Sequence, residues 1–299
     1  MPTTRLPGWL RQHLAAVRAL LVLTVLVGLL YPLAVTAIAQ LPGLKSRADG
    51  SLVAAGGRDV GSALIGQAFT DDKGDAIPKY FQSRPSAAGD GYDPTSTSAS
   101  NLGPESIVDV PPTTAGGDDG KSSLLTDVCA RSLAVGTLED VDGSRPYCTP
   151  GGVAAALAVF HTGPGYAGPV TRAVSVNEYC DTTTTPFLAT YQGVAVQCHR
   201  SGEDVTRGRL VPVRGDAPAL PAVPADAVTA SGSGLDPDIS PAYADLQATR
   251  VATVRGLPAD RVRQLIRAHT EGRGLGFLGE PGVNVLRLNL ELDRIAPVT

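Results

Sequence analysis

Residues 19–39 read ALLVLTVLVGLLYPLAVTAIA, an uncharged run of 21 residues that decides the architecture of the chain. As an α-helix this run is about 31 Å long at ~1.5 Å per residue, which matches a hydrocarbon core of ~30 Å. A helix of a soluble domain buries one stripe and wets the other, whereas this run is apolar all round. Its hydroxyls, on Thr24, Tyr31 and Thr36, can bond locally. We therefore expect a single transmembrane helix over residues 18–39.

Charges on the N-terminal side of the run predict its orientation in the cell membrane. Arg5, Arg11 and Arg18 precede it without any acidic residue, and arginines mark the cytoplasmic flank of a span. We expect residues 1–17 to form a cytoplasmic tail and everything after about residue 40 to lie outside. The alternative is a cleaved signal peptide with a small-x-small site at residues 37–39, but the run exceeds the about 7–15 apolar residues of a signal sequence.

One side of the predicted span carries polar and small side chains. Thr24, Gly28, Tyr31 and Val35 recur at i, i+4, i+7 and i+11, and a glycine lets another helix approach closely. These four are the candidate partner-facing residues within the membrane. The alternative is an anchor that faces lipid all round.

Composition and missing motifs restrict the possible functions. A net charge of −4 over 299 residues excludes a strongly basic nucleic-acid surface, and one span cannot form a pore by itself. Gly61 and Gly66 have the spacing of a phosphate loop, but Gln67 stands where the lysine is required. Serine-hydrolase and zinc-protease motifs are absent as well. We expect no catalytic residue and no metal site, although a glycosidase-type carboxylate pair stays open.

All four cysteines follow the span and lie within one stretch of 70 residues: Cys129, Cys148, Cys180 and Cys198. An even number outside the cytoplasm predicts two disulfides, for which three pairings are possible. Proline-rich segments flank this stretch, PPTTAGGDDGKSS at 111–123 and RGDAPALPAVPA at 214–225. We therefore expect an inserted, disulfide-containing subdomain at residues 107–222.

The segment before the insertion, residues 80–106, is rich in Ser, Thr, Asn, Gly and Pro, which form turns. A flexible linker is one interpretation. Tyr80, Phe81, Arg84 and Tyr92 argue against it, because linkers rarely carry such residues so close together. We expect ordered loops suited to recognition by main-chain and hydroxyl groups.

Periodicity predicts the elements near the C-terminus. Ser240 and Gly256 bracket a helix over residues 243–255, and a second helix starts at Pro258. Arg250 falls within the apolar face of the first helix, so it is either ion-paired inside, which we favour, or in contact with a partner. Residues 283–293, VNVLRLNLELD, alternate with period 2 and predict a strand.

Several longer motifs, taken in order, resemble one family. After the span they are GSALIGQ at 61–67, SRPSAA at 83–88, SNLGP at 100–104, VTASGSG at 228–234 with Asp236 and Pro237, Gln247 with RVA at 250–252, and Gly279 with VNV, LNL and LD between 283 and 293. This order resembles the KdpC family, the small subunit of the bacterial ATP-driven potassium pump. The resemblance covers residues 1–106 and 223–299, and a typical member lacks the insertion.

The resemblance implies partners, ligands and a role. KdpC sits beside the channel-like subunit KdpA, the ATP-hydrolysing P-type subunit KdpB and the small single-span subunit KdpF. It is needed for assembly and is described as a catalytic chaperone that raises the ATP affinity of KdpB. ATP and the transported K⁺ are thus ligands of the complex, and neither is bound tightly by this chain. Because a domain outside the membrane cannot touch cytoplasmic ATP, any effect on nucleotide must be allosteric or pass through the span.

We therefore expect a mixed α/β (α+β) fold: one transmembrane helix, then an extracytoplasmic domain of residues 40–106 and 223–299 that carries the insertion. Its loops at 83–104 and 229–240 are expected to dock on the outer face of the channel-like subunit. The candidate residues there are Arg84, Pro85, Ser86, Asn101, Ser231, Ser233 and Asp236. Two alternatives are a membrane-anchored binding or hydrolytic module whose activity lies in the insertion, and a plain envelope structural protein.

Overall fold

The computed structural model describes residues 7–111 and 120–298. The chain forms two compact units, Met1–Leu64 and Ile65–Thr299. Arg5 of the predicted cytoplasmic tail and residues 112–119 of the first proline-rich flank lie outside the described residues.

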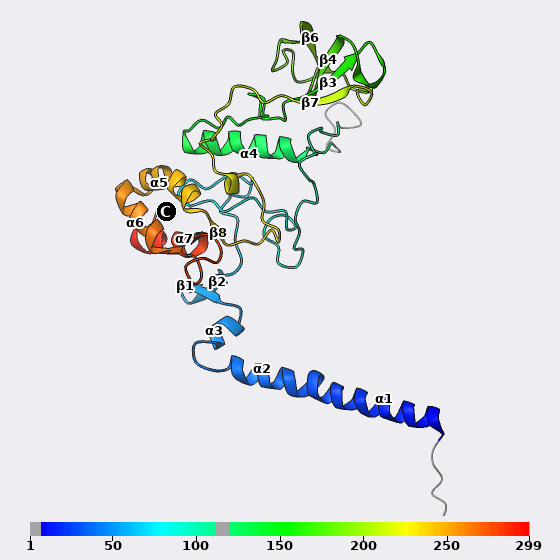
Figure 1. The fold of residues 1–299 in the computed structure, drawn as a ribbon. Helices are drawn as coiled ribbons and strands as arrows, with labels where there is room; N and C mark the ends of the chain where they lie inside the picture. The colour runs from blue at the N-terminus through cyan, green and yellow to red at the C-terminus, as the bar shows by residue number, and fades with distance from the viewer. Residues whose placement is uncertain (1–6, 112–119, 299) are drawn as a thin grey trace, which may run out of the picture. The chain divides into compact units, whose positions relative to one another are not determined.

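The first unit begins with one long helix (Figure 1), built from α1 (Gly8–Val25), the π-helical turn η1 (Leu26–Leu30) and α2 (Tyr31–Ala39). Within the described part of the chain it is the one helix long and apolar enough to cross a membrane, and none of its apolar window is buried. The predicted span is confirmed as a helix that fits a single-pass anchor. Pro32 lacks a backbone N–H, and the wider turn of η1 directly before it takes up the defect.

A short helix and a hairpin complete the first unit. They are α3 (Lys45–Ala48), β1 (Leu52–Ala55) and β2 (Arg58–Ser62), the two strands pairing antiparallel. Gly56 and Gly57 connect the strands with φ values of +59° and +77°. Two successive positive φ angles are what a two-residue hairpin turn requires, and glycine adopts them without strain.

The main core of the second unit is built by three helices and a small antiparallel sheet with strand order β8-β10-β9. The elements are β8 (Asp238–Ile239), α5 (Pro241–Arg255), α6 (Ala259–Ala268), β9 (Thr270–Glu271), β10 (Gly282–Asn284) and α7 (Val285–Ile295). Ser240 caps α5 by accepting a hydrogen bond from the Tyr243 N–H, and Gly256 ends it at φ +64°. Both predicted helices, the one up to residue 255 and the one after Pro258, are confirmed.

The strand predicted at residues 283–293 is wrong. Only its first two residues belong to β10, and α7 begins at Val285. Asn284 decides the change, because its side chain caps the helix by accepting a hydrogen bond from the Arg287 N–H. The leucine alternation contains a helical stripe as well: Val285, Leu288, Asn289 and Leu292 are all buried, at the i, i+3, i+4, i+7 spacing of a helix.

A long helix of the predicted insertion, α4 (Leu124–Glu139), contacts α5 through a buried ion pair. The Arg250 Nε donates to Glu139 Oε1 and Oε2 at 3.0 and 3.1 Å, and the two side chains are only 9% and 1% exposed. Burial raises the pKa of Glu139, against the pull of the guanidinium. The internal ion pair expected for Arg250 is therefore confirmed.

The rest of the predicted insertion contains a five-stranded sheet with strand order β5-β6-β4-β3-β7. Its strands are β3 (Ala156–His161), β4 (Val170–Tyr179), β5 (Thr190–Tyr191), β6 (Val194–His199) and β7 (Arg209–Pro212). A short 3-10 turn, η2 (Pro164–Tyr166), follows β3, and a second one, η3 (Ala225–Ala227), lies beyond residue 222. Only β4 and β6 pair in parallel. Alternate residues of β3 enter two separate apolar clusters, so the sheet is covered on both faces.

Both predicted disulfides are present, and the structure selects one of the three possible pairings. Cys129 of α4 bonds Cys148, and Cys180 after β4 bonds Cys198 of β6. Each bond closes a short loop, with sequence separations of 19 and 18 residues. The boundaries of the insertion at 107 and 222 remain a prediction.

The buried ion pair predicts that loss of Arg250 destabilises the protein far more than loss of an exposed arginine. Arg250→Met leaves the Glu139 carboxylate without its cation inside the protein, which costs about 3–5 kcal/mol of unfolding free energy. Arg294→Met is the matched control, because the Arg294–Glu291 pair is 71% and 26% exposed and contributes about 0–1 kcal/mol. Urea unfolding of the purified full-length chain in detergent measures both. Equal losses for the two variants would contradict this account.

The disulfides predict sensitivity to reductant. Crosslinks that close loops of 18 and 19 residues stabilise a domain by roughly 3 kcal/mol each in the chain-entropy estimate. We expect dithiothreitol to lower the melting temperature of the purified chain. A variant with all four cysteines changed to alanine should melt at one temperature with or without reductant. A wild-type melting curve unaffected by complete reduction would argue against a stabilising role.

Candidate functional site

The predicted outer loops meet at one ion pair. The Arg84 guanidinium lies 2.9 Å from Asp236 Oδ2, and the side chains are 23% and 32% exposed. The same guanidinium donates to the carbonyls of Thr229 and Ala230 at 3.3–3.5 Å. Arg84 therefore fixes the loop that carries it onto the loop at residues 229–236.

Ser86 and Tyr92 close the same surface with further hydrogen bonds. The Ser86 Oγ donates to the Gly234 carbonyl at 2.6 Å and accepts from the N–H of Tyr92. The Tyr92 hydroxyl donates to the Arg84 carbonyl at 2.7 Å, and burial raises the pKa of Tyr92 to about 12. The phenol is thus a neutral donor at physiological pH. These bonds favour ordered loops over a flexible linker.

The other predicted outer residues differ in how they contact these two loops. Ser231 Oγ accepts from the Asp236 N–H at 3.4 Å, and Ser233 Oγ accepts from the Leu235 N–H at 3.1 Å. Pro85 is half-buried, whereas Ser233 and Asn101 are exposed. The structure thus brings Arg84, Ser86, Ser231 and Asp236 together. We call the surface of residues 84–92 and 229–236 the loop surface.

Gly66 lies directly behind the loop surface. A Cβ there would overlap the Tyr92 ring and would lie 2.6 Å from the Asp236 carbonyl oxygen, while the Gly66 N–H donates to the Leu235 carbonyl at 2.9 Å. The second glycine of the GSALIGQ motif, Gly66, is required because two loops approach its backbone. A nucleotide phosphate does not fit at Gly66, because Tyr92 and the Asp236 backbone already occupy the adjacent space.

Two buried amides, which the sequence marked as motif residues but not as site residues, hold the start of these loops. Asn289 of α7 accepts from the Phe81 N–H at 2.9 Å and donates to the Phe81 carbonyl at 3.0 Å. Gln247 of α5 does the same for Gln82, at 2.6 and 3.1 Å. Each amide thus makes the two backbone hydrogen bonds of one residue that a neighbouring strand would otherwise make. The available signal was an amide within an otherwise apolar helical stripe.

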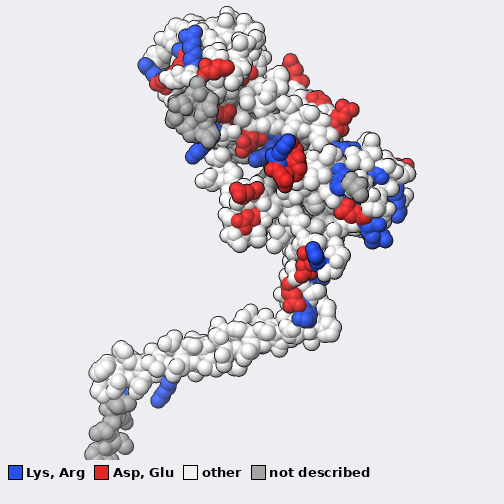
Figure 2. All heavy atoms as spheres, turned by 180° about the vertical axis from the view of Figure 1, so that it is seen from behind, with Lys and Arg blue, Asp and Glu red and all other residues white. Residues whose placement is uncertain are grey.

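The candidate membrane-facing residues Thr24, Gly28, Tyr31 and Val35 are all exposed, and the π-helical turn η1 includes Gly28. Figure 2 shows that most of the long helix is free of charged side chains. A Cβ at Gly28 would meet only the Thr24 methyl group, at 3.9 Å. The backbone at Gly28 is therefore open to another helix.

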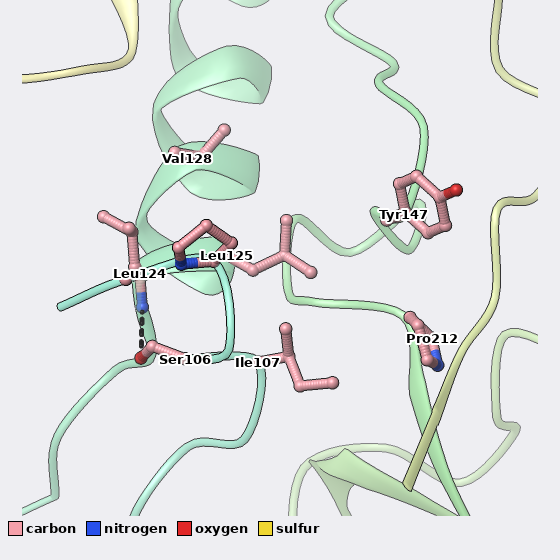
Figure 3. A pocket seen from close by; sticks show the side chains of 9 residues that line it. Ser106, Ile107, Leu124, Leu125, Val128, Tyr147 and Pro212 are labelled. Carbon is pink, nitrogen blue, oxygen red and sulfur yellow. Dashed lines mark hydrogen bonds between the residues drawn. The ribbon is translucent and has the colours of Figure 1, made fainter.

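The second unit also contains an open apolar cavity of about 390 Å³. Its walls come from the chain around Ser106 and Ile107, from α4 and from the end of β7 (Figure 3). Leu124, Leu125, Val128 and Pro212 line it, and the Ser106 Oγ accepts from the Leu124 N–H at 3.1 Å. No charged side chain lines this cavity, and the side-chain hydroxyls in its wall are those of Ser106 and Tyr147.

Metal ligands are not assembled in the part of the chain that the structure describes, where no three His, Cys, Asp or Glu side chains form a group. His199, next to Cys198 in the sequence, has both ring nitrogens within hydrogen-bond distance of carbonyls, those of Val176 at 2.9 Å and Glu203 at 3.2 Å. Its ring also stacks on Tyr179. Both ring nitrogens of His199 thus face backbone carbonyls, and neither is directed at a metal site.

Comparison with known proteins identifies the family. The family model described as "KdpC: K+-transporting ATPase, c chain" matches residues 13–109 and 202–294. The chain is 38% identical to the potassium-transporting ATPase KdpC subunit of Kineococcus radiotolerans over 292 residues, 98% of each chain. It is 36% identical to that of Mycobacterium tuberculosis (95% of this chain, 99% of the relative) and 32% identical to that of Koribacter versatilis (96% and 97%). This chain belongs to the KdpC family.

As a KdpC, the chain is a subunit of the Kdp potassium-uptake ATPase, and other Kdp subunits are its partners. The resemblance recognised in the sequence is confirmed. The KdpC family model leaves residues 110–201 unmatched, whereas these three relatives align over at least 95% of both chains. They are thus of similar length to this KdpC.

The close approach at Gly66 predicts a selective effect of one methyl group. Gly66→Ala should lower the unfolding free energy by about 1–3 kcal/mol, because the Cβ forces the loops apart. Gly232→Ala is the matched control on the loop surface, since a Cβ there meets nothing within 4 Å, and it should change stability by less than about 0.5 kcal/mol. Thermal melting of both purified variants measures the difference. Similar melting temperatures would show that the loops are not packed on Gly66.

Proposed function

We propose that this subunit stabilises the Kdp complex from outside the cell membrane, by docking its loop surface on the channel-like subunit KdpA. The observation that carries the proposal is the joining of two distant segments, around Arg84 and Asp236, into one hydrogen-bonded surface. Such a surface needs no folding on binding, so little ordering entropy opposes docking. It carries no catalytic group, which suits a subunit that assembles and positions.

The proposed orientation puts the N-terminus in the cytoplasm and the second unit outside. Arg11 and Arg18 support it, because they lie on the N-terminal side of the apolar run. The two disulfides support it independently, because disulfides persist in oxidising compartments. Within the membrane, we propose that the Gly28 side of the helix packs against a span of a partner subunit.

We propose that the subunit also acts as a catalytic chaperone, and the proposed orientation limits how it does so. A domain outside the membrane cannot contact ATP bound to KdpB in the cytoplasm. We propose that it raises the ATP affinity of KdpB by favouring one arrangement of the complex, a coupling free energy transmitted through the span and the neighbouring subunits. K⁺ is the transported ion, and the hydroxyls and carbonyls of the loop surface face its route without forming a fixed site.

The anchor gives the test of this proposal. Deletion of residues 19–39 should abolish co-purification of the chain with KdpA and KdpB, and with it growth at limiting potassium. The control is Leu33→Ile, which keeps the apolar helix and should leave both readouts at the wild-type level. Protease added to spheroplasts should digest the second unit of the wild-type chain.

Normal growth of the deletion strain at limiting potassium would refute the proposal. It would then favour the alternative of a binding or hydrolytic module whose activity lies in residues 107–222. A second unit protected from external protease would refute the orientation.

A further inference from the structure

The chain between β9 and β10 exposes three large apolar side chains. Leu275, Phe277 and Leu278 are 85%, 69% and 54% exposed. They lie in the turn of residues 273–280, which we call the apolar tip. Exposed apolar residues that occur singly need no explanation, but three within four positions mark a contact surface.

The apolar tip is held rigidly. Gly274 and Leu278 exchange two backbone hydrogen bonds of 2.8 Å, and the Phe277 N–H donates to the Gly274 carbonyl at 3.2 Å. At its base β9 and β10 pair antiparallel, and Val283 of β10 is completely buried. The three side chains are therefore presented on a fixed turn.

Backbone strain at Leu275 also indicates a contact surface. Leu275 has φ +52°, a left-handed conformation that is uncommon outside glycine and asparagine. Its side chain is almost fully exposed, so no packing within this chain compensates the strain. Strained residues of this kind concentrate at binding sites, where a partner uses the conformation.

Charges around the apolar tip indicate the class of partner. Arg273 pairs with Glu280 at 2.7 Å, and Arg287 lies 3.7 Å from Glu271. This collar has equal numbers of both signs. An anionic lipid surface is recognised by an excess of Lys and Arg, which the collar lacks, whereas an apolar centre with a polar rim is the usual arrangement of a protein interface.

We infer that the apolar tip inserts into an apolar socket with a polar rim on the outer face of the channel-like subunit. The inference rests on the proposed docking and adds a second contact to the loop surface. Phe277 is the central anchor, since aromatic side chains dominate the energy of such contacts. The charge-balanced collar surrounds the socket and excludes water from it.

Photo-crosslinking in the intact complex tests the contact directly. Phe277→p-benzoylphenylalanine in cells that express all Kdp subunits should crosslink to the channel-like subunit upon irradiation, as identified by mass spectrometry of the product. Leu220→p-benzoylphenylalanine is the matched control, because Leu220 is 89% exposed and lies outside the apolar tip. It should give no crosslink to that subunit. Crosslinking of residue 277 to lipid, to another subunit or to nothing would overturn the inference.

A double variant measures the strength of the contact. Leu275→Ser with Phe277→Ser should reduce retention of the channel-like subunit on the detergent-purified chain by about tenfold or more, the loss expected of an interface anchor. Leu220→Ser should retain it fully. The double variant removes no core packing, so its melting temperature alone in detergent should equal that of the wild type.

The outcomes separate this inference from the proposal on which it rests. Wild-type retention by the double variant would show that the apolar tip is not the contact, while docking through the loop surface would stand. A wild-type chain that retains no channel-like subunit would refute the docking itself.

Discussion

The loop surface depends on residues 78–82, a turn and the two residues that follow it. Side chains of the helices α5 and α7 make most of the backbone hydrogen bonds of this segment, in place of a neighbouring strand. Asn289 and Gln247 serve the N–H and carbonyl groups of Phe81 and Gln82. The carbonyls of residues 78–80 accept from Arg250 and Arg255. Buried backbone groups must be paired, so these four side chains determine where the segment lies. The loop that begins at residue 83 therefore starts from a fixed position.

The same constraint connects the predicted insertion to the family domain. Arg250 bonds the segment and, on its other edge, the Glu139 carboxylate at the end of α4. Arg255 bonds Lys79 and also Asp293 of α7. An arginine has five donors in a fixed plane, and each of these two uses them to join elements that are far apart in sequence. The position of α4 and the course of the loops are therefore coupled through one guanidinium.

Local signals explain which parts of the fold were predictable. Neighbouring residues or composition indicate each of three features: the span, the caps of α5 and the number of disulfides. The strand predicted at 283–293 failed because LRLNLELD satisfies period 2 and a helical stripe together, and only the cap at Asn284 separates them. Strand β3 of the five-stranded sheet was missed because it begins within VAAALA at 153–158, an alanine run with little β-branching.

The candidate site was only partly predictable for the same reason. Motifs marked Arg84, Ser86 and Asp236, but their pairing spans more than 140 residues, and no local pattern encodes it. The roles of Gly66, Gln247 and Asn289 are also defined by partners remote in sequence. Local sequence does not encode the exposure of Leu275 and Phe277 either, because exposure depends on which residues the rest of the fold covers.

A membrane anchor changes what the outer contacts must achieve. A tethered domain meets its partner at an effective concentration of roughly millimolar when the linker is short, so each contact can be weak without loss of assembly. Within the loop surface, Arg84 already bonds Asp236 and two carbonyls, and these groups gain little further energy from a partner. These groups contribute specificity instead, because they fix the shape of the loop surface and a wrong partner does not fit that shape. In the proposed docking, affinity comes from apolar area, which in this chain is offered by the span and by the side chains around Phe277. On that proposal, the polar loops set the register of docking, and the apolar contacts hold it.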